Sequence, residues 1–414
     1  IMRILFIHQN FPAQFKYLAP TLAKQHQVRI LTLNARLADN WQGIPVNHYA
    51  LQKASTKGIH PWIIDFEAQV IRGEATLYAA FNLRQQGFTP DVIIAHPGWG
   101  ESLALKDVWP DAKLGLYCEF FYRAEGADVG FDPEFPNTDP ALASRIRLKN
   151  TNTLIQLSTF DAGISPTDWQ ASTFPELFRN RISVIHDGID STLLQPNPSA
   201  TLTLKINSGD LLTLSREDEI ITFVNRNLEP YRGYHTFMRC LPRLLKQRPQ
   251  ARVLLVGGDG TSYGAKPLGS KSWKERFIDE VRPQISEADW SRVHFMGNLP
   301  YQHFVTLLQC SSLHVYLTYP FVLSWSLLEA MSIGCAIVAS DTSPVRDAII
   351  HNETGRLINF FDYKALADEI SSLLDNPDER QRLGANARAL LYEKYDLKTI
   401  CLPKQMEWVE NILK

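Results

Sequence analysis

The sequence predicts an α/β protein with two doubly wound parallel sheets, and three observations lead to this prediction. Short, β-branched apolar runs alternate with longer helical patterns through the first half, as in parallel sheets covered on both faces. The alternation restarts at residues 220–225 and continues to residue 340. A chain of 414 residues is also longer than one core usually organises. The predicted strands are RILFIH, QVRILTL, DVIIAH, AKLGLY and ISVIHDG, then EIITFVN, ARVLLVGG, RVHFMG, SLHVYL and CAIVAS.

The domain boundary is expected between residues 195 and 215. The segment LLQPNPSATLTLKINSGD there is rich in Pro, Ser, Thr and Asn and has no helical period. We therefore predict one domain over residues 1–200 and a second over 201–389, with a C-terminal helix, 390–414, that returns to the first. A cleft between two such domains is a usual ligand site.

The charge balance, the cysteines and the lengths of the apolar runs restrict the kinds of partner and site that we expect. Lys and Arg total 42 against 44 Asp and Glu, a net charge of −2, which gives no reason to expect a nucleic-acid partner. The five cysteines form no CxxC pair, so neither a disulfide framework nor a zinc site is predicted, and a reduced cytosol fits best. No apolar run is long enough for a membrane-spanning helix.

Two arginines lie in one predicted strand-to-helix turn of the second half. Arg226 follows the strand at 220–225, and Arg232 precedes Gly233 and an amphipathic helix. Such a turn lies at the carboxyl edge of a doubly wound sheet, where ligands bind. Paired guanidinium groups suit a multiply charged oxyanion such as a diphosphate. The alternative is structural: each arginine pairs with Glu229 or a surface acid.

A helix predicted to start near Ser324 and to stop at Gly334 follows the strand SLHVYL. Its N-terminal amides would point into the same crevice, and the amides of a helix start attract phosphate. Glu329 lies in its second turn, where a carboxylate is well placed to accept hydrogen bonds from vicinal hydroxyls such as those of a ribose.

Four stretches together resemble a known family across most of the chain. They are VNRNLEPYRGY, LLEAMSIGCAIVASD, VIHDGID and GRLI. The sequence is similar to retaining nucleotide-sugar transferases of glycosyltransferase family 4, also called group 1. The resemblance implies the GT-B fold, in which two Rossmann-like domains face each other across a cleft.

The resemblance also assigns roles to residues. It implies that Arg226, Arg232 and His96 are catalytic. The two arginines would bind the donor diphosphate, with Arg232 where the family usually has Lys, and Glu329 would bind the ribose. His96, which ends DVIIAH, falls where the family often has a histidine facing the sugar or acceptor, although a histidine at a strand end is more often structural. The other donor-binding residues that we expect are Phe321, Val322, Leu323, Ser324, Gly188, Ala13 and Gln14.

The sequence departs from the family pattern at two places. The first acid of the E-x7-E motif would fall eight residues before Glu329, and Phe321 stands there. An aromatic ring accepts no strong hydrogen bond from sugar hydroxyls, so sugar binding or specificity must differ. The loop HQNFPAQFKYLA lacks the glycine that the family often has near the phosphates, so Ala13 and Gln14 must serve despite carrying a Cβ.

We therefore expect a hexosyltransferase that moves a sugar from a UDP- or GDP-sugar to a hydroxyl of a saccharide or lipid-linked acceptor, in surface polysaccharide or glycolipid synthesis. No D-x-D pair occurs, so no metal or other cofactor is expected, and fixed cations would stabilise the departing diphosphate. The resemblance implies retention by front-face attack. The expected location is the cytoplasm, with peripheral contact at the inner membrane face left open.

Two alternatives remain open from the sequence. One is a catalytically silent GT-B subunit that supports a partner transferase, and the other is a GT-B sugar-nucleotide epimerase. An epimerase adds carboxylates at the sugar, and Phe321 removes one acid from that position. A dinucleotide dehydrogenase fits poorly because GxGxxG is absent after the first strand.

Overall fold

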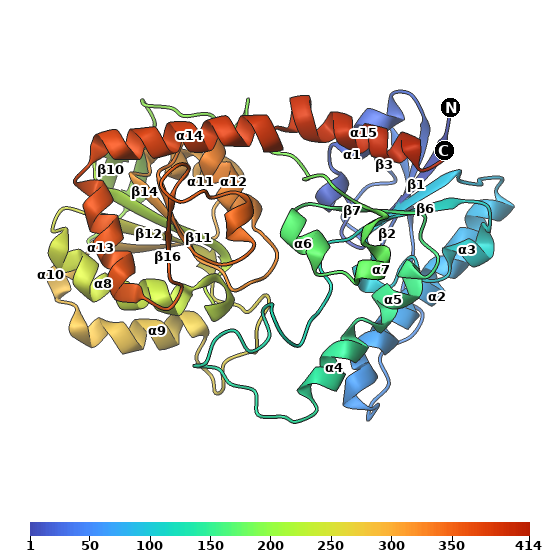
Figure 1. Cartoon of the computed structure of the whole chain (residues 1–414), viewed down its shortest axis with the longest axis horizontal. Coiled ribbons are helices and arrows are strands. Elements are labelled where there is room, and N and C mark those ends of the chain that lie inside the picture. The colour runs from blue at the N-terminus through green and yellow to red at the C-terminus, as the bar shows by residue number, and fades with distance from the viewer. The chain divides into compact units, whose positions relative to one another are not determined.

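The computed structural model describes all 414 residues, which divide into two compact units (Figure 1). Unit 1 comprises Ile1–Gly188 and Lys398–Lys414, and unit 2 comprises Ile189–Leu397. The division thus falls at 188/189 and 397/398, whereas the sequence placed it near 200 and 390. The difference has a local cause, because the backbone N–H of Ile189 bonds to Tyr395 and that of Leu397 bonds to Ile189 within unit 2.

Unit 1 contains an eight-stranded sheet in the order β3-β4-β2-β1-β5-β6-β7-β8, parallel except for the β3–β4 pair. The sequence missed three of these strands, namely β3, β4 and β7. The strands are β1 (Arg3–Ile7), β2 (Gln27–Thr32), β3 (Asn40–Trp41), β4 (Ile44–His48), β5 (Val92–Ala95), β6 (Lys113–Tyr117), β7 (Ala162–Ser165) and β8 (Ile182–Val184).

Helices cover both faces of this sheet, which explains why its central strand β1 is apolar in every residue after Arg3. Ile4 and Phe6 of β1 pack into one hydrophobic cluster, and Leu5 and Ile7 pack into another. The helices of unit 1 are α1 (Leu18–Ala23), α2 (Ile64–Gln85), α3 (Leu105–Val108), α4 (Leu142–Lys149), α5 (Thr151–Leu157), α6 (Asp168–Ser172), α7 (Glu176–Arg179) and α15 (Leu402–Asn411).

The last helix, α15, belongs to unit 1 and lies beside α1 (Figure 1). Its Trp408 packs into the cluster that holds Phe6, and the Trp408 indole donates a hydrogen bond to the Gly163 carbonyl at 3.0 Å. The preceding long helix, α14 (Pro377–Tyr395), packs in unit 2 against α12 (Trp325–Ile333). The helical tail predicted as one piece is therefore divided between the units.

Unit 2 contains a six-stranded parallel sheet in the order β13-β12-β11-β14-β15-β16. Its strands are β11 (Ile220–Asn227), β12 (Arg252–Gly258), β13 (Val293–Gly297), β14 (Leu313–Tyr316), β15 (Ile337–Ser340) and β16 (Arg356–Ile358), and its further helices are α8 (Tyr234–Gln247), α9 (Trp273–Val281), α10 (Glu287–Trp290), α11 (Tyr301–Cys310) and α13 (Tyr363–Leu374). Both units are thus Rossmann-like α/β folds, as the sequence predicts.

The segment expected to be a linker is instead a β-hairpin of unit 2. Strands β9 (Thr201–Lys205) and β10 (Leu211–Ser215) pair antiparallel, and Leu202, Leu204 and Leu214 are buried in the unit 2 core. The alternation TLTLK before an N-S-G-D turn is typical of a hairpin, and its period of two residues differs from that of a helix.

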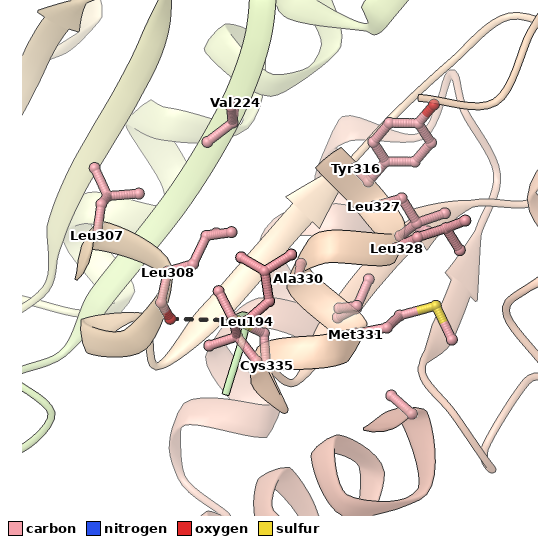
Figure 2. Packing of buried hydrophobic residues seen from close by; sticks show 14 of the residues in the cluster. Leu194, Val224, Leu307, Leu308, Tyr316, Leu327, Leu328, Ala330, Met331 and Cys335 are labelled. Carbon is pink, nitrogen blue, oxygen red and sulfur yellow. Dashed lines mark hydrogen bonds between the residues drawn. The ribbon is translucent and has the colours of Figure 1, made fainter. Parts of the chain in front are cut away.

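The unit 2 core packs β11, β14 and α12 together (Figure 2). Leu327, Leu328 and Met331 of α12 are fully buried, and Gly334 ends the helix at φ 81°, as predicted for its stop. Figure 2 also shows that the Tyr316 hydroxyl points away from this cluster. None of the helices is both long and apolar enough to cross a lipid bilayer.

Candidate functional site

The predicted unit 2 residues lie around the carboxyl ends of β11 and β14, which are neighbours in the sheet. At this pair the strand order reverses direction, because β12 lies on one side of β11 and β14 on the other. Ligands of doubly wound sheets bind outside such a switch point. Arg226 is at the end of β11, and Arg232 ends the short 3-10 helix η4 (Pro230–Arg232) that follows.

The two arginines occupy very different environments. Arg226 is exposed and its guanidinium forms no hydrogen bond or ion pair within the chain. Arg232 is only 3% exposed, and its Nη1 donates to the Tyr316 hydroxyl at 3.2 Å, the Thr318 hydroxyl at 2.7 Å and the Val322 carbonyl at 2.9 Å. The structural alternative of pairing with an acid therefore fits neither arginine, since the partners of Arg232 are neutral oxygens.

Arg232 keeps its charge despite this burial. Burial lowers the pKa of Arg232, but the nearby Tyr316, Tyr263 and Glu229 raise it by a larger amount, so that the pKa lies above its ordinary value. The guanidinium also lies 5.0 Å from the ring centre of Tyr263 and 5.8 Å from that of Phe321, which are cation–π distances. A fixed, largely desolvated cation acts more strongly on nearby charge than an exposed one.

Glu229 orders the loop that carries Tyr263. Its carboxylate is 1% exposed and accepts the backbone N–H groups of Ser262 at 2.6 Å, Tyr263 at 3.0 Å and Gly264 at 3.3 Å. Because Glu229 also precedes η4, it joins the Arg232 turn to the loop after β12. Sequence reasoning had considered Glu229 only as an ion-pair partner.

The residues of the predicted donor-binding stretch 321–324 lie in different surroundings. The Phe321 ring lies edge-on to Tyr231 at 5.4 Å and to Tyr263 at 5.2 Å. Leu323 packs into the hydrophobic core, so its side chain faces the interior. Ser324 is the N-cap of α12, and its N–H donates to the Tyr316 hydroxyl at 3.0 Å, so this amide already has a partner inside the protein.

Glu329 accepts a hydrogen bond from the Tyr301 hydroxyl at 2.6 Å through Oε2. Burial raises the pKa of Glu329 above its ordinary value, and the bond from Tyr301 opposes this rise. The carboxylate is only partly exposed and keeps acceptor capacity on its other oxygen, since an ionised carboxylate can accept about four hydrogen bonds. Tyr301, at the start of α11, had not been predicted as a site residue.

His96 in unit 1 is held at both ring nitrogens. It lies at the end of β5, is 7% exposed and caps the short helix η3 (Pro97–Trp99), where Nδ1 accepts the Gly98 N–H at 3.0 Å. Nε2 lies 2.6 Å from a carboxylate oxygen of Glu119. The Tyr117 ring stacks on the imidazole at 5.5 Å, and Trp99 lies at 4.8 Å.

His8, which ends β1, lies 5.6 Å from His96 and repeats its arrangement. His8 Nδ1 accepts the Asn10 N–H at 2.9 Å, and its Nε2 lies 2.9 Å from Gln14 Oε1. Burial, reinforced by His96, lowers the pKa of His8 to about 3, so this ring is neutral. His8 was not predicted as a site residue, although both histidines end predicted strands that are neighbours in the sheet.

The loop after β1 takes the backbone shape expected of a glycine. Ala13 has φ 41°, in the left-handed region that residues with a Cβ rarely enter. The substitution of alanine for a family glycine is thus accommodated at a cost of about 1 kcal/mol. Gly188 has φ 96°, and its N–H donates to His186 Nδ1 at 3.0 Å. Gly188 is therefore a turn residue at the end of unit 1.

Unit 1 also contains a buried acid that was not predicted as a site residue. Glu101 is fully buried, and one of its oxygens accepts the Tyr49 hydroxyl at 2.6 Å. Burial raises the pKa of Glu101 to about 7, although the bond from Tyr49 and the nearby His96 oppose the rise. Strand β4, which the sequence missed, positions Tyr49, and this explains why the pair was not predicted.

Two family models match the chain. The model described as Glycosyl transferase family 4 group matches residues 24–194, and the model described as Glycosyl transferases group 1 matches residues 212–390. Together they cover most of both units. The first match spans the His96 edge of unit 1, and the second spans the Arg226, Arg232 and Glu329 edge of unit 2.

Curated relatives include a D-inositol 3-phosphate glycosyltransferase from Corynebacterium efficiens, 26% identical over 211 residues, which are 50% of this chain and 46% of the relative. A glycogen synthase from Mycobacterium tuberculosis is 27% identical over 220 residues, 53% of this chain and 46% of the relative. The chain thus spans about half the length of the curated relatives that it matches.

Solved structures show the same fold over nearly the whole chain. A sucrose-phosphate synthase from Thermosynechococcus elongatus superposes with a TM-score of 0.72 at 17% identity and covers 99% of both chains. HepE from Anabaena, solved in complex with UDP-glucose, superposes with a TM-score of 0.66 at 16% identity over 98% of this chain and 100% of HepE.

Proposed function

Because the chain belongs to the group 1 glycosyltransferases of the family 4 type, we propose that it transfers a sugar from a UDP- or GDP-sugar to a hydroxyl acceptor. The solved structures of HepE hold UDP and UDP-glucose, which supports a nucleotide-sugar donor for this chain. We further propose that transfer proceeds with retention at the anomeric carbon and without a metal ion, on a saccharide or lipid-linked acceptor in the synthesis of surface polysaccharide or glycolipid.

The observation that carries the proposal is the arrangement at the carboxyl edge of β11 and β14. A free, exposed guanidinium on Arg226 and a buried one on Arg232 lie at the same strand-to-helix turn that precedes α8. Arg232 is tied to the loop before α12 through Thr318 and Val322. This provides one fixed cation, Arg232, and one free cation, Arg226, for a leaving diphosphate, whose charge they stabilise as it develops.

Glu329 completes the donor proposal. It lies one turn beyond the start of α12 and accepts hydrogen bonds, which suits the vicinal hydroxyls of a ribose. Phe321 would contact the sugar, and the pair of His96 and Glu119 would serve the acceptor. The two guanidinium groups would take the role that a bridging metal has in other transferases, and turnover is therefore proposed to need no divalent ion.

A panel of sugar nucleotides tests the donor proposal. A ligand present at about 100 times its dissociation constant stabilises the folded state by roughly 2.7 kcal/mol, so the true donor should raise the melting temperature more than its competitors. The same donor should release UDP or GDP when it is incubated with the protein. A protein whose melting temperature no sugar nucleotide changes would contradict the proposal.

One observation favours a second candidate function. Phe321 stands where the family has an acid, and its ring is packed against Tyr231 and Tyr263. A catalytically silent GT-B subunit that binds nucleotide and supports a partner would tolerate this loss. Strong stabilisation by UDP or GDP, without nucleotide release from any sugar donor, would favour this alternative.

A further inference from the structure

His96 has no free ring nitrogen to offer a substrate. The backbone N–H of Gly98 donates to Nδ1 at 3.0 Å, and an N–H donor requires a lone pair on that nitrogen. The ring proton of the neutral imidazole therefore sits on Nε2 and points to Oε2 of Glu119 at 2.6 Å. The imidazole can neither accept a proton nor donate a further hydrogen bond in this arrangement.

Glu119, unlike His96, has an atom that is free to accept a hydrogen bond from a substrate. Only Oε2 of its carboxylate has a partner, and Oε1 accepts no hydrogen bond within the chain. The Glu119 side chain is 33% exposed, against 9% for that of His96. The group that this histidine–carboxylate pair presents to solvent is therefore the Glu119 oxygen.

The backbone around Glu119 is fixed. The Gln170 side-chain amide donates to the Glu119 carbonyl at 2.8 Å, and the next residues are tied to α5 and α6 through Asn150 and Thr173. His96 itself is enclosed by Tyr117 and Trp99. Because β5 and β6 are adjacent parallel strands, both residues lie at the same carboxyl edge of the unit 1 sheet.

We propose that Glu119 Oε1 accepts a hydrogen bond from the acceptor hydroxyl and that His96 is the positioning residue that holds this carboxylate. This inference rests on the proposed transferase function. Before the reaction the hydroxyl proton points to Glu119 Oε1. As the acceptor oxygen bonds to C1 of the sugar, the bond from C1 to the diphosphate oxygen breaks with its electron pair, and the hydroxyl proton turns from Glu119 to the departing phosphate oxygen, where negative charge develops. Glu119 orients the hydroxyl and keeps its negative charge throughout.

The test compares Glu119→Gln with Glu176→Gln, a control at an exposed glutamate of α7 in the same unit. Glutamine keeps the size of the side chain and can still accept from His96, but it removes the charge. The donor is UDP-glucose, or the sugar nucleotide that stabilises the wild type most. Nucleotide release is measured with water alone and with a panel of uncharged p-nitrophenyl glycosides as acceptors.

We expect Glu119→Gln to lower nucleotide release roughly 10- to 100-fold, the range for a lost hydrogen bond to a charged group. The dissociation constant for UDP should stay within about two-fold of the wild type, and Glu176→Gln should behave as the wild type. Unchanged release by Glu119→Gln, or an equal loss of UDP binding and release, would overturn the inference.

A nuclear magnetic resonance measurement separates substrate contact from a purely structural role. The ¹⁵N signals of the His96 ring should report the Nε2–H tautomer in both the wild type and Glu119→Gln, because the glutamine oxygen still accepts. A tautomer change in the variant would attribute its loss of turnover to a disturbed His96 and would overturn a direct contact by Glu119. A wild type that neither binds nor turns over any sugar nucleotide would instead refute the transferase function itself.

Discussion

Nη1 of Arg232 donates a hydrogen bond to the Thr318 hydroxyl at 2.7 Å, which joins the turn after β11 to the loop after β14. The same nitrogen also serves Tyr316 and Val322. One cation therefore organises the loops at the switch point of the unit 2 sheet before any ligand arrives, whereas Arg226 is held by none of them.

This contrast predicts different phenotypes for the two arginines. Arg232→Ala leaves buried acceptors without their donor and should lower the free energy of unfolding by roughly 1 to 3 kcal/mol. Arg226→Ala removes an exposed, unpaired side chain and should change that free energy by less than about 0.5 kcal/mol. Both should lower kcat by on the order of 10² to 10³. Urea unfolding and steady-state kinetics check the prediction, and two variants of equal stability would contradict it.

Donor affinity should depend on pH through Glu329. Its pKa is raised by burial, so it takes up a proton at a higher pH than an ordinary glutamate, and only the ionised form is a pure acceptor for ribose hydroxyls. UDP affinity should therefore fall as the pH is lowered through this raised pKa. Tyr301→Phe removes a bond that lowers the pKa, so the fall should begin at higher pH.

Glu329→Gln is the control for this pH effect, because an amide does not titrate. Its UDP affinity should be weaker at neutral pH and should lack the acid-side change. Isothermal titration calorimetry at a series of pH values measures both. A wild-type affinity that is independent of pH down to the stability limit would show that Glu329 does not bind the nucleoside in its ionised form.

Turnover should survive metal removal. The proposed diphosphate contacts are the cations Arg226 and Arg232 rather than a bridging ion, so EDTA should leave nucleotide release within about two-fold. Added Mg²⁺ or Mn²⁺ should not raise it. Activity that EDTA abolishes and Mn²⁺ restores would refute the proposed metal independence.

Phe321 is expected to affect the sugar rather than the nucleotide. Phe321→Ala should leave the affinity for UDP within about two-fold, because Arg232 and Glu329 remain, while the ratio of kcat/KM values among different UDP-sugars should change. Phe361→Ala, at a ring that is 41% exposed, is a control. A Phe321 variant that weakens UDP and every UDP-sugar equally would argue for a role in the nucleotide site instead.

Replacing Gly233 by a residue with a Cβ should destabilise the folded protein for two separable reasons. It has φ 72°, and a Cβ there would lie 2.3 Å from Leu317 Cβ. Gly233→Ala should therefore cost roughly 2 to 5 kcal/mol in stability. Gly209→Ala, in the β9–β10 turn at φ 86° with open space around it, isolates the backbone effect and should cost about 1 to 2 kcal/mol. Thermal unfolding measures the stability of both variants. If Gly233→Ala and Gly209→Ala lost the same free energy of unfolding, the Leu317 side chain would have moved to make room for the new Cβ.

The sequence alone was sufficient to predict two doubly wound sheets. Strands such as Arg3–Ile7 and Ile220–Asn227 are buried on both faces along most of their length, and the end of α12 at Gly334 is a local property of a few adjacent residues. The prediction was wrong at β9 and β10, where apolar and polar residues alternate along most of each strand of a hairpin. That alternation has a period of two residues, so the absence of a helical period there did not mean the absence of structure.

The sequence placed Arg226, Arg232 and Glu329 at the unit 2 edge and His96 at the unit 1 edge, because strand ends of a parallel sheet share one edge. Only the tertiary structure decided which hydrogen-bond partners each of these side chains has, and so which atoms remain for a ligand. The partners of Arg232 lie 84, 86 and 90 positions further along the chain, and Glu119 is 23 positions from His96. Hydrogen bonds over such separations depend on how strands are ordered in the sheet, and residue spacing does not encode that order.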